Sequence, residues 1–230
     1  MAAEPARGFF LTLEGLDGSG KTTQIRRLTA WLTAQNIPHT LTRQPGGTET
    51  GDRIRALLLD SKSSGLAPFT ELAMMFADRA QAIDQVIEPA LTRGEFVVCD
   101  RFTDSTEAYQ GGGRELGSEI VLDLHRLLCG NLQPDLTILL LPDLQTSVSR
   151  ARRRNLRQIA EKGADENRFE REQFDFFARV YSKYREIAAR EPVRVVAIDG
   201  DLSVDQVHSR VITAIAERLA QWQPRFKTLV

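Results

Sequence analysis

A glycine-rich segment at residues 15–22 (GLDGSGKT) carries the clearest chemical signal in this chain of 230 residues. It fits the pattern G-x-x-x-x-G-K-[ST], between an apolar run at residues 9–13 and a helical pattern at residues 23–35. Glycine lets the backbone curl so that N–H groups point at phosphate oxygens, and the following helix adds its positive end. We therefore predict a nucleoside triphosphate site formed by Gly15, Leu16, Asp17, Gly18, Ser19, Gly20, Lys21, Thr22 and Thr23.

Three side chains of this loop have chemistry of their own. Lys21 can reach the outer phosphates, and the Thr22 hydroxyl can hold Mg²⁺. Phosphates would repel the Asp17 carboxylate unless it faces a Mg²⁺ ion, a sugar hydroxyl or an arginine. The alternative for Asp17 is a solvated carboxylate at the surface, which is common for acids in loops.

Arginines must reach the site from other segments, because the loop contributes only one cation and phosphoryl transfer needs positive charge around the migrating group. The richest source is a helical pattern whose arginines share one face: Arg150, Arg153, Arg154 and Arg157. Such a face would repel itself unless an anion lay against it, so we predict a phosphate-closing lid at roughly residues 145–170. A solvated basic helix or a nucleic-acid patch is the alternative.

A second apolar run, at residues 96–99, ends in Asp100 and Arg101. An acid at the end of a strand is the usual partner of a phosphate loop, where it acts on Mg²⁺ directly or through water. The neighbouring arginine could fork onto a pair of phosphate oxygens. The alternative is an ion pair at the surface between these two residues.

The elements that must position these residues alternate along the chain. Five β-rich runs occur along the chain, at residues 9–13, 39–43, 96–99, 136–141 and 193–198. Helical patterns alternate with them, at residues 23–35, 52–59, 68–92, 119–128, 145–160, 171–189 and 204–221. The pattern predicts an α/β fold with a parallel sheet of five strands between two helical layers, and ligands beyond the carboxyl ends of the strands. Glycine-rich or polar stretches at residues 43–48, 61–66 and 110–114 are interpreted as loops, and residues 162–167 as a hinge. We expect one domain over residues 1–230.

Composition limits the classes of function. Lys and Arg (30) nearly balance Asp and Glu (31), so the chain as a whole has no strong attraction to nucleic acid or to a membrane surface. Cys99 and Cys129 lack metal-type spacing and are expected to be reduced core thiols of a cytoplasmic protein. No apolar run approaches the length of a membrane span, and the first eight residues lack the apolar core of a signal peptide.

Two further segments give weaker signals. Tyr109 and Gln110 precede three glycines, and an amide suits the edge of a base, although a plain flexible loop would look much the same. Met75, Phe76 and Arg79 lie on one helical pattern, where an apolar stripe is more often core than a platform for a base.

Taken together, these segments resemble bacterial thymidylate (dTMP) kinases, which are P-loop NTPases. The resemblance covers residues 9–198 and rests on EGLDGSGKTT (14–23), TRQPGGT (42–48), FADR (76–79), DRF (100–102) with DST (104–106), AYQG (108–111), PDLT (134–137) and the arginine-rich lid. It implies that ATP, with Mg²⁺, gives its γ-phosphate to dTMP to form dTDP and ADP. It also implies a cytoplasmic homodimer without a nucleic-acid or membrane partner.

The resemblance also implies roles for individual residues. Catalysis would fall to Lys21, Asp17, Arg101, Arg150 and Arg154, with Arg150 over the adenine. The metal would be held by Thr22 and Asp100. Residues that would bind the acceptor nucleotide are Arg43, Arg55, Met75, Phe76, Arg79, Arg101, Thr106, Tyr109 and Gln110. Within this set Arg79 and Gln110 would hydrogen-bond thymine, and Tyr109 would crowd the 2′ position of the sugar.

The chain departs from the family pattern at three places. Gln44 replaces the usual glutamate, Met75 stands where the thymine-stacking aromatic is expected with Phe76 beside it, and Asn167 precedes Arg168 where aspartate is common. Two other functions stay open at this point. One is a different P-loop nucleotide or small-metabolite kinase, and the other is a nucleotide-dependent switch ATPase that uses its basic helix.

Overall fold

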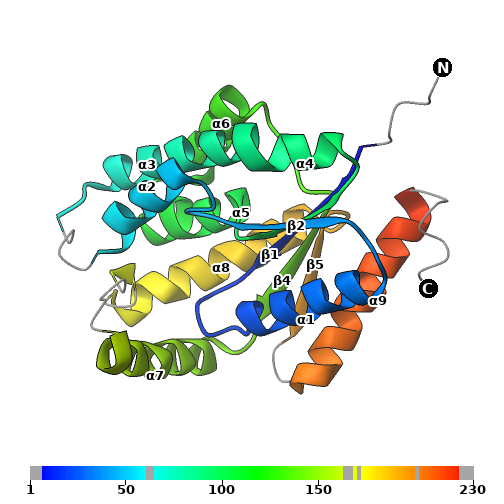
Figure 1. Cartoon of the computed structure of the whole chain (residues 1–230). Coiled ribbons are helices and arrows are strands. Elements are labelled where there is room, and N and C mark those ends of the chain that lie inside the picture. The colour runs from blue at the N-terminus through cyan, green and yellow to red at the C-terminus, as the bar shows by residue number, and fades with distance from the viewer. Residues whose placement is uncertain (1–6, 61–64, 163–167, 170–171, 200–201, 223–230) are drawn as a thin grey trace.

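The computed structural model describes residues 7–60, 65–162, 168–169, 172–199 and 202–222, without the side chains of residues 154, 156–162, 221 and 222. Five parallel strands form one sheet in the order β2-β3-β1-β4-β5 (Figure 1). The strands are β1 (Phe9–Glu14), β2 (His39–Arg43), β3 (Phe96–Asp100), β4 (Leu136–Leu141) and β5 (Val195–Asp199). The prediction of five parallel strands is therefore confirmed.

Helices lie between the strands in sequence and on both faces of the sheet in space. They are α1 (Lys21–Ala34), α2 (Glu49–Leu59), α3 (Pro68–Ala82), α4 (Glu88–Thr92), α5 (Thr103–Thr106), α6 (Ser118–Cys129), α7 (Leu144–Lys162), α8 (Phe174–Arg190) and α9 (Val204–Trp222), with π-helical turns η2 (Ile83–Ile87) and η3 (Glu107–Gly113). Among the described residues, none of these helices combines the length and apolar character that a membrane span requires.

Alternate residues of the central strand face two different cores. Leu11 of β1 packs in a cluster with Leu28 of α1 and Val211 of α9, while Phe10 packs with Leu91 of α4 on the opposite face. Figure 1 shows α1 and α9 side by side on one face, with α3, α4 and α6 on the other. Strands buried on both faces explain the continuous apolar runs in the sequence.

Residues 110–114 were predicted to be a loop, and this prediction is wrong. All but Arg114 belong to η3, a π-helical segment packed against α8. A Cβ atom on Gly112 would lie 2.8 Å from Cβ of Lys183, and one on Gly113 would lie 2.5 Å from the Phe176 ring. The glycines are therefore needed for close packing between two helices, rather than for a flexible turn.

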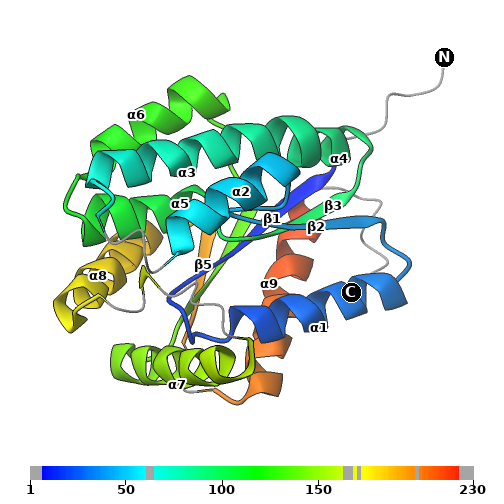
Figure 2. The ribbon, with the colours of Figure 1, turned by 60° about the vertical axis from the view of Figure 1, so that its left-hand side comes forward.

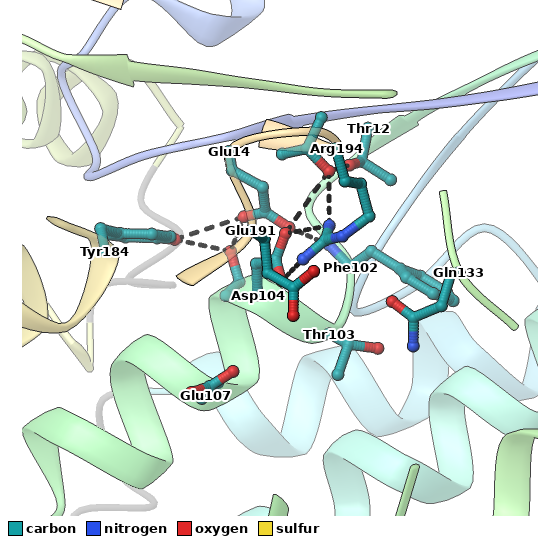
Figure 3. Close-up of polar contacts among 12 residues, drawn as sticks. Thr12, Glu14, Phe102, Thr103, Asp104, Glu107, Gln133, Tyr184, Glu191 and Arg194 are labelled. Atoms are coloured by element: carbon teal, nitrogen blue, oxygen red, sulfur yellow. Dashed lines mark hydrogen bonds and ion pairs between the residues drawn. The ribbon is translucent and has the colours of Figure 1, made fainter. Parts of the chain in front are cut away.

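A buried polar network occupies the region where β1 ends (Figure 3). Glu14, the last residue of β1, is fully buried; its Oε1 accepts a hydrogen bond from the Phe102 backbone N–H at 2.6 Å, and its Oε2 accepts one from the Ser105 hydroxyl. Nearby, Asp104 accepts two hydrogen bonds from Arg194, at 2.7 and 2.9 Å. The network fixes the segment after β3 against the strand that leads into the glycine-rich loop.

We predict that Gly113→Ala destabilises the fold. The added methyl group has no free space beside Phe176, so the free energy of unfolding should fall by about 1–3 kcal/mol. Chemical denaturation measures this change. Gly65→Ala is the control, because a Cβ at Gly65 meets no atom within 4 Å; equal effects from the two substitutions would contradict the packing role.

A second prediction concerns Glu14, where burial and the nearby Asp104 carboxylate raise the pKa to about 7. The native state then holds a proton that the unfolded state releases near the ordinary pKa of 4.5, so stability is lost as the pH rises through about 7. The free energy of unfolding of the wild type, minus that of Glu14→Gln, should fall by about 2–3 kcal/mol between pH 5 and pH 8. Denaturation curves of both proteins over this range test it, and a difference independent of pH would contradict it.

Candidate active site

A single cavity of about 630 Å³ lies beyond the carboxyl ends of β1 and β3. It brings together residues from the glycine-rich loop, the ends of β2 and β3, and helices α2, α3, α5, α7 and η3. The predicted site residues that line it are Asp17, Gly18, Gly20, Lys21, Thr22, Thr23, Arg43, Arg55, Met75, Arg79, Asp100, Arg101, Thr106, Tyr109, Gln110 and Arg150. Most of the predicted site residues therefore line the same cavity.

The loop between β1 and α1 has the curled backbone that its glycines allow. Gly18 has φ 80° and Gly20 has φ 102°, and α1 begins directly after Gly20, at Lys21. The N–H groups of the first turn of α1 therefore lie at the cavity with the positive end of the helix. Leu16 is instead buried against Val148 of α7, and Gly15 and Ser19 do not line the cavity.

Lys21 is held inside this loop. Its Nζ donates to the carbonyl oxygens of Gly15 at 2.8 Å and Leu16 at 2.9 Å. Burial and the cation of Arg101 lower its pKa to about 8. The ammonium group is thus close to the cavity and poorly solvated, which strengthens its attraction to an anion.

Arg101 connects the glycine-rich loop to the segment after β3. Its backbone is left-handed, with φ 68°, and its guanidinium donates to Asp17 at 3.0 Å and to Ser105 at 2.9 Å. The guanidinium also lies over the Tyr109 ring, 5.1 Å from its centroid. An arginine was one of the partners predicted for Asp17, and the structure places Arg101 beside it. The alternative of an ion pair between Arg101 and the neighbouring Asp100 is not seen in the described part of the chain, since Arg101 pairs with Asp17.

Arg43 and Arg55 line the cavity beside the loop that follows β2. Arg43 pairs with Asp52 at 3.1 Å, and Arg55 donates to the Pro45 carbonyl at 2.9 Å. Both guanidinium groups therefore add positive charge to the cavity that Arg101 and Lys21 also line.

The far end of the cavity is formed by Arg79 and Gln110, which are both almost fully buried. Arg79 donates through Nε to Gln44 at 2.8 Å and through Nη2 to the Thr106 hydroxyl at 2.7 Å. Its Nη1, the Gln110 Oε1 and the Gln44 Nε2 are buried and have no hydrogen-bond partner among the described residues. Buried polar groups without partners are rare, so these three atoms are suited to meet a polar ligand.

Of the two candidates for covering a base, Met75 lines the cavity and Phe76 does not. Phe76 is fully buried in a cluster with Leu72, Val121 and Cys129, and its ring lies 5.0 Å from the Arg79 guanidinium. Phe76 therefore packs against the Arg79 guanidinium without itself lining the cavity.

Phe169 lines the cavity and was missed in the sequence. Its ring lies edge-on to Tyr109, with 5.6 Å between centroids, and Arg168 beside it donates to the Leu58 carbonyl at 2.6 Å. An aromatic residue directly after a lid arginine was the only available signal. The hinge predicted at residues 162–167 lies outside the described residues, apart from Lys162 at the end of α7.

The predicted lid helix is present as α7. Figures 1 and 2 place α7 at the same end of the molecule as the loop between β1 and α1, and the Gly18 backbone packs against Ser147 and Ala151 of α7. Arg150 reaches the cavity, and Arg153 is exposed. The side chains of Arg154 and Arg157 lie outside the described part of the chain.

Comparisons with known proteins agree with this geometry. The sequence model of the family described as thymidylate kinase matches residues 13–211. The chain is 43% identical to a thymidylate kinase of Alkalilimnicola ehrlichii over 94% of its own length and 96% of that protein, and 46% identical to one of Citrifermentans bemidjiense over 92% and 93%. A crystal structure of thymidylate kinase from Ehrlichia chaffeensis superposes with a TM-score of 0.71 at 32% identity, covering 91% of this chain and 98% of that one. The resemblance read from the sequence is confirmed, and the chain belongs to the thymidylate kinase family.

Proposed function

We propose that this chain transfers the γ-phosphoryl group of ATP to dTMP and releases dTDP and ADP. Family membership supports the reaction. The observation that carries the proposal is the shared cavity, because the phosphate loop lines it together with Arg79, Tyr109 and Gln110. Two nucleotides bound there would meet at their phosphates, so catalysis rests on positioning and charge.

On the ATP side, the loop backbone and Lys21 would hold the outer phosphates, with Arg150 near the adenine. The loop itself carries no arginine, so cations from other segments must balance the charge that spreads over the migrating group. Lys21 lines the cavity from the start of α1 and Arg101 from the end of β3, and both are already fixed by hydrogen bonds. Groups held in place before the reaction stabilise the transition state without reorganisation.

We propose that Mg²⁺ is bound by Thr22 and Asp100. Both line the cavity, and Asp100 Oδ1 is buried without a hydrogen-bond partner among the described residues. No group of three or more His, Cys, Asp or Glu side chains suited to a metal occurs in the described residues, and Mg²⁺ is commonly held by one or two protein groups together with substrate phosphates. When bound, Mg²⁺ neutralises charge on the β- and γ-phosphates.

On the acceptor side, Arg101, Arg43 and Arg55 would bind the dTMP phosphate. No general base is required, since the acceptor phosphate can attack as an anion. Arg79 and Gln110 would hydrogen-bond the thymine, Met75 would cover its face, and Tyr109 would crowd the 2′ position and favour deoxyribose. Thr106 holds Arg79 in place through the 2.7 Å hydrogen bond.

We also propose that the chain forms a homodimer and is located in the cytoplasm. The Leu127 and Leu128 side chains of α6 are 79% and 49% exposed, and a second copy of the chain could cover them. Light scattering of the purified protein tests the oligomeric state, and a monomer at micromolar concentration would contradict it.

A coupled assay of ADP release over a panel of nucleoside monophosphates tests the proposed reaction. We expect the highest kcat/KM with dTMP and no turnover without an acceptor. Faster turnover of UMP, AMP or GMP would indicate a different kinase. Hydrolysis of ATP that needs no acceptor would indicate a switch ATPase.

Arg101→Ala should lower kcat/KM for dTMP by about 100-fold or more, and should change ATP binding much less. Steady-state kinetics and ATP titration measure the two effects. The substitution also leaves Asp17 without its arginine, so Asp17→Asn/Arg101→Ala is the matched control that removes the unpaired carboxylate. Equal losses for both nucleotides in the double variant would refute the acceptor role.

A further inference from the structure

Glu71 of α3 lies directly behind the base end of the cavity without lining it. It is fully buried, and its carboxylate accepts hydrogen bonds from Gln110 Nε2 at 2.7 Å and Arg114 Nη2 at 3.1 Å. It also pairs with Arg168 Nη1 at 2.7 Å. Two guanidinium groups therefore hold this carboxylate in one place, against the side chain of Gln110.

The hydrogen bond between Gln110 and Glu71 fixes the orientation of the Gln110 side-chain amide. A carboxylate offers only acceptors, so the group that faces Glu71 must be the NH₂ of the amide. The carbonyl Oε1 is then the other end of the amide, and it has no hydrogen-bond partner among the described residues. Arg79 Nη1, also without such a partner, is a donor. Arg79 and Gln110 both line the cavity, so this part of its wall holds one donor and one acceptor whose orientations are fixed.

We propose that Glu71 is a positioning residue that fixes the orientation of the Gln110 side-chain amide, and that this orientation determines which base is bound. This inference rests on the proposed function. Thymine offers a carbonyl acceptor and a ring N–H donor side by side, which match Arg79 and Gln110. Cytosine offers an amino donor and a ring nitrogen acceptor in the same places, so it would set donor against donor and acceptor against acceptor. Buried mismatches of this kind discriminate strongly between otherwise similar ligands.

Glu71→Gln tests the proposal, because an amide at this position can face Gln110 with either its oxygen or its nitrogen. The measured quantity is the ratio of kcat/KM for dTMP to kcat/KM for dCMP, together with KM for ATP and the melting temperature. We expect the ratio to fall by about 10-fold or more while KM for ATP stays within about 2-fold of the wild type. A general loss of structure would lower both activities together and leave the ratio unchanged.

Glu107→Gln is the matched control. Glu107 is also a buried glutamate, lies three residues before Gln110 on η3 and accepts two hydrogen bonds from Arg190, both at 2.7 Å. Its substitution removes a comparable ion pair without touching Gln110, so the dTMP to dCMP ratio should be retained even where stability falls. An equal drop of the ratio in both variants would overturn the proposal.

If Glu71→Gln does not fold, Glu71→Asp serves in its place. It keeps the charge between Arg114 and Arg168 and withdraws the acceptor from Gln110 by one methylene group, so a reduced ratio is again expected. An unchanged ratio in either folded variant overturns the role of Glu71. Absence of dTMP turnover in the wild type would instead refute the proposed function, and with it this inference.

Discussion

The hydrogen bonds of the Glu14 carboxylate hold the two halves of the site together. Glu14 ends β1 and directly precedes the glycine-rich loop, so its backbone leads into the ATP side. Its side chain binds the Phe102 N–H and the Ser105 hydroxyl, next to Arg101 on the acceptor side. One buried carboxylate therefore fixes the relative position of the two phosphate-binding segments, and the Arg101–Asp17 ion pair at 3.0 Å joins them a second time.

This arrangement suits a reaction in which the protein makes no covalent bond to the phosphoryl group. Lys21, Arg101, Arg43 and Arg55 line the same cavity, and in this structure each is held by a carboxylate or a carbonyl oxygen. Positive groups that are already oriented cost little to reorganise when charge develops. The same principle holds at the base end, where Glu71 and Gln44 orient the polar groups that face the cavity.

Much of this molecule could be predicted from its sequence, because the signals were local. The loop at residues 15–22 lies between a strand and a helix, and continuous apolar runs identify strands buried on both faces. Gly112 and Gly113 were misinterpreted as parts of a loop, because the contact that requires glycine there is with α8, more than 60 residues away in sequence. Local composition cannot distinguish a flexible loop from a helix that requires close packing.

The roles of Glu71 and Phe169 were hidden for a similar reason. An isolated glutamate in a helical pattern gives no sign that a distant glutamine and arginine will surround it. Phe169 follows a polar stretch and reaches the cavity only through tertiary packing beside Tyr109. In contrast, Arg101 and Asp17 each sit in a motif, so their place at the site could be predicted, although their contact with each other was one of several possibilities.

The proposed reaction depends most on one cavity that accepts both nucleotides with their phosphates facing each other. A ligand in which adenosine and thymidine are joined through their 5′ oxygens by a polyphosphate chain tests this directly, with affinity measured by isothermal titration calorimetry. We predict that one molecule of this ligand binds per chain, at least about 100-fold more tightly than ATP or dTMP alone. Once one nucleoside of the ligand is bound, the other binds without a further loss of translational and rotational entropy. Affinity no greater than that of ATP alone, or simultaneous binding of a separate dTMP, would contradict the shared cavity.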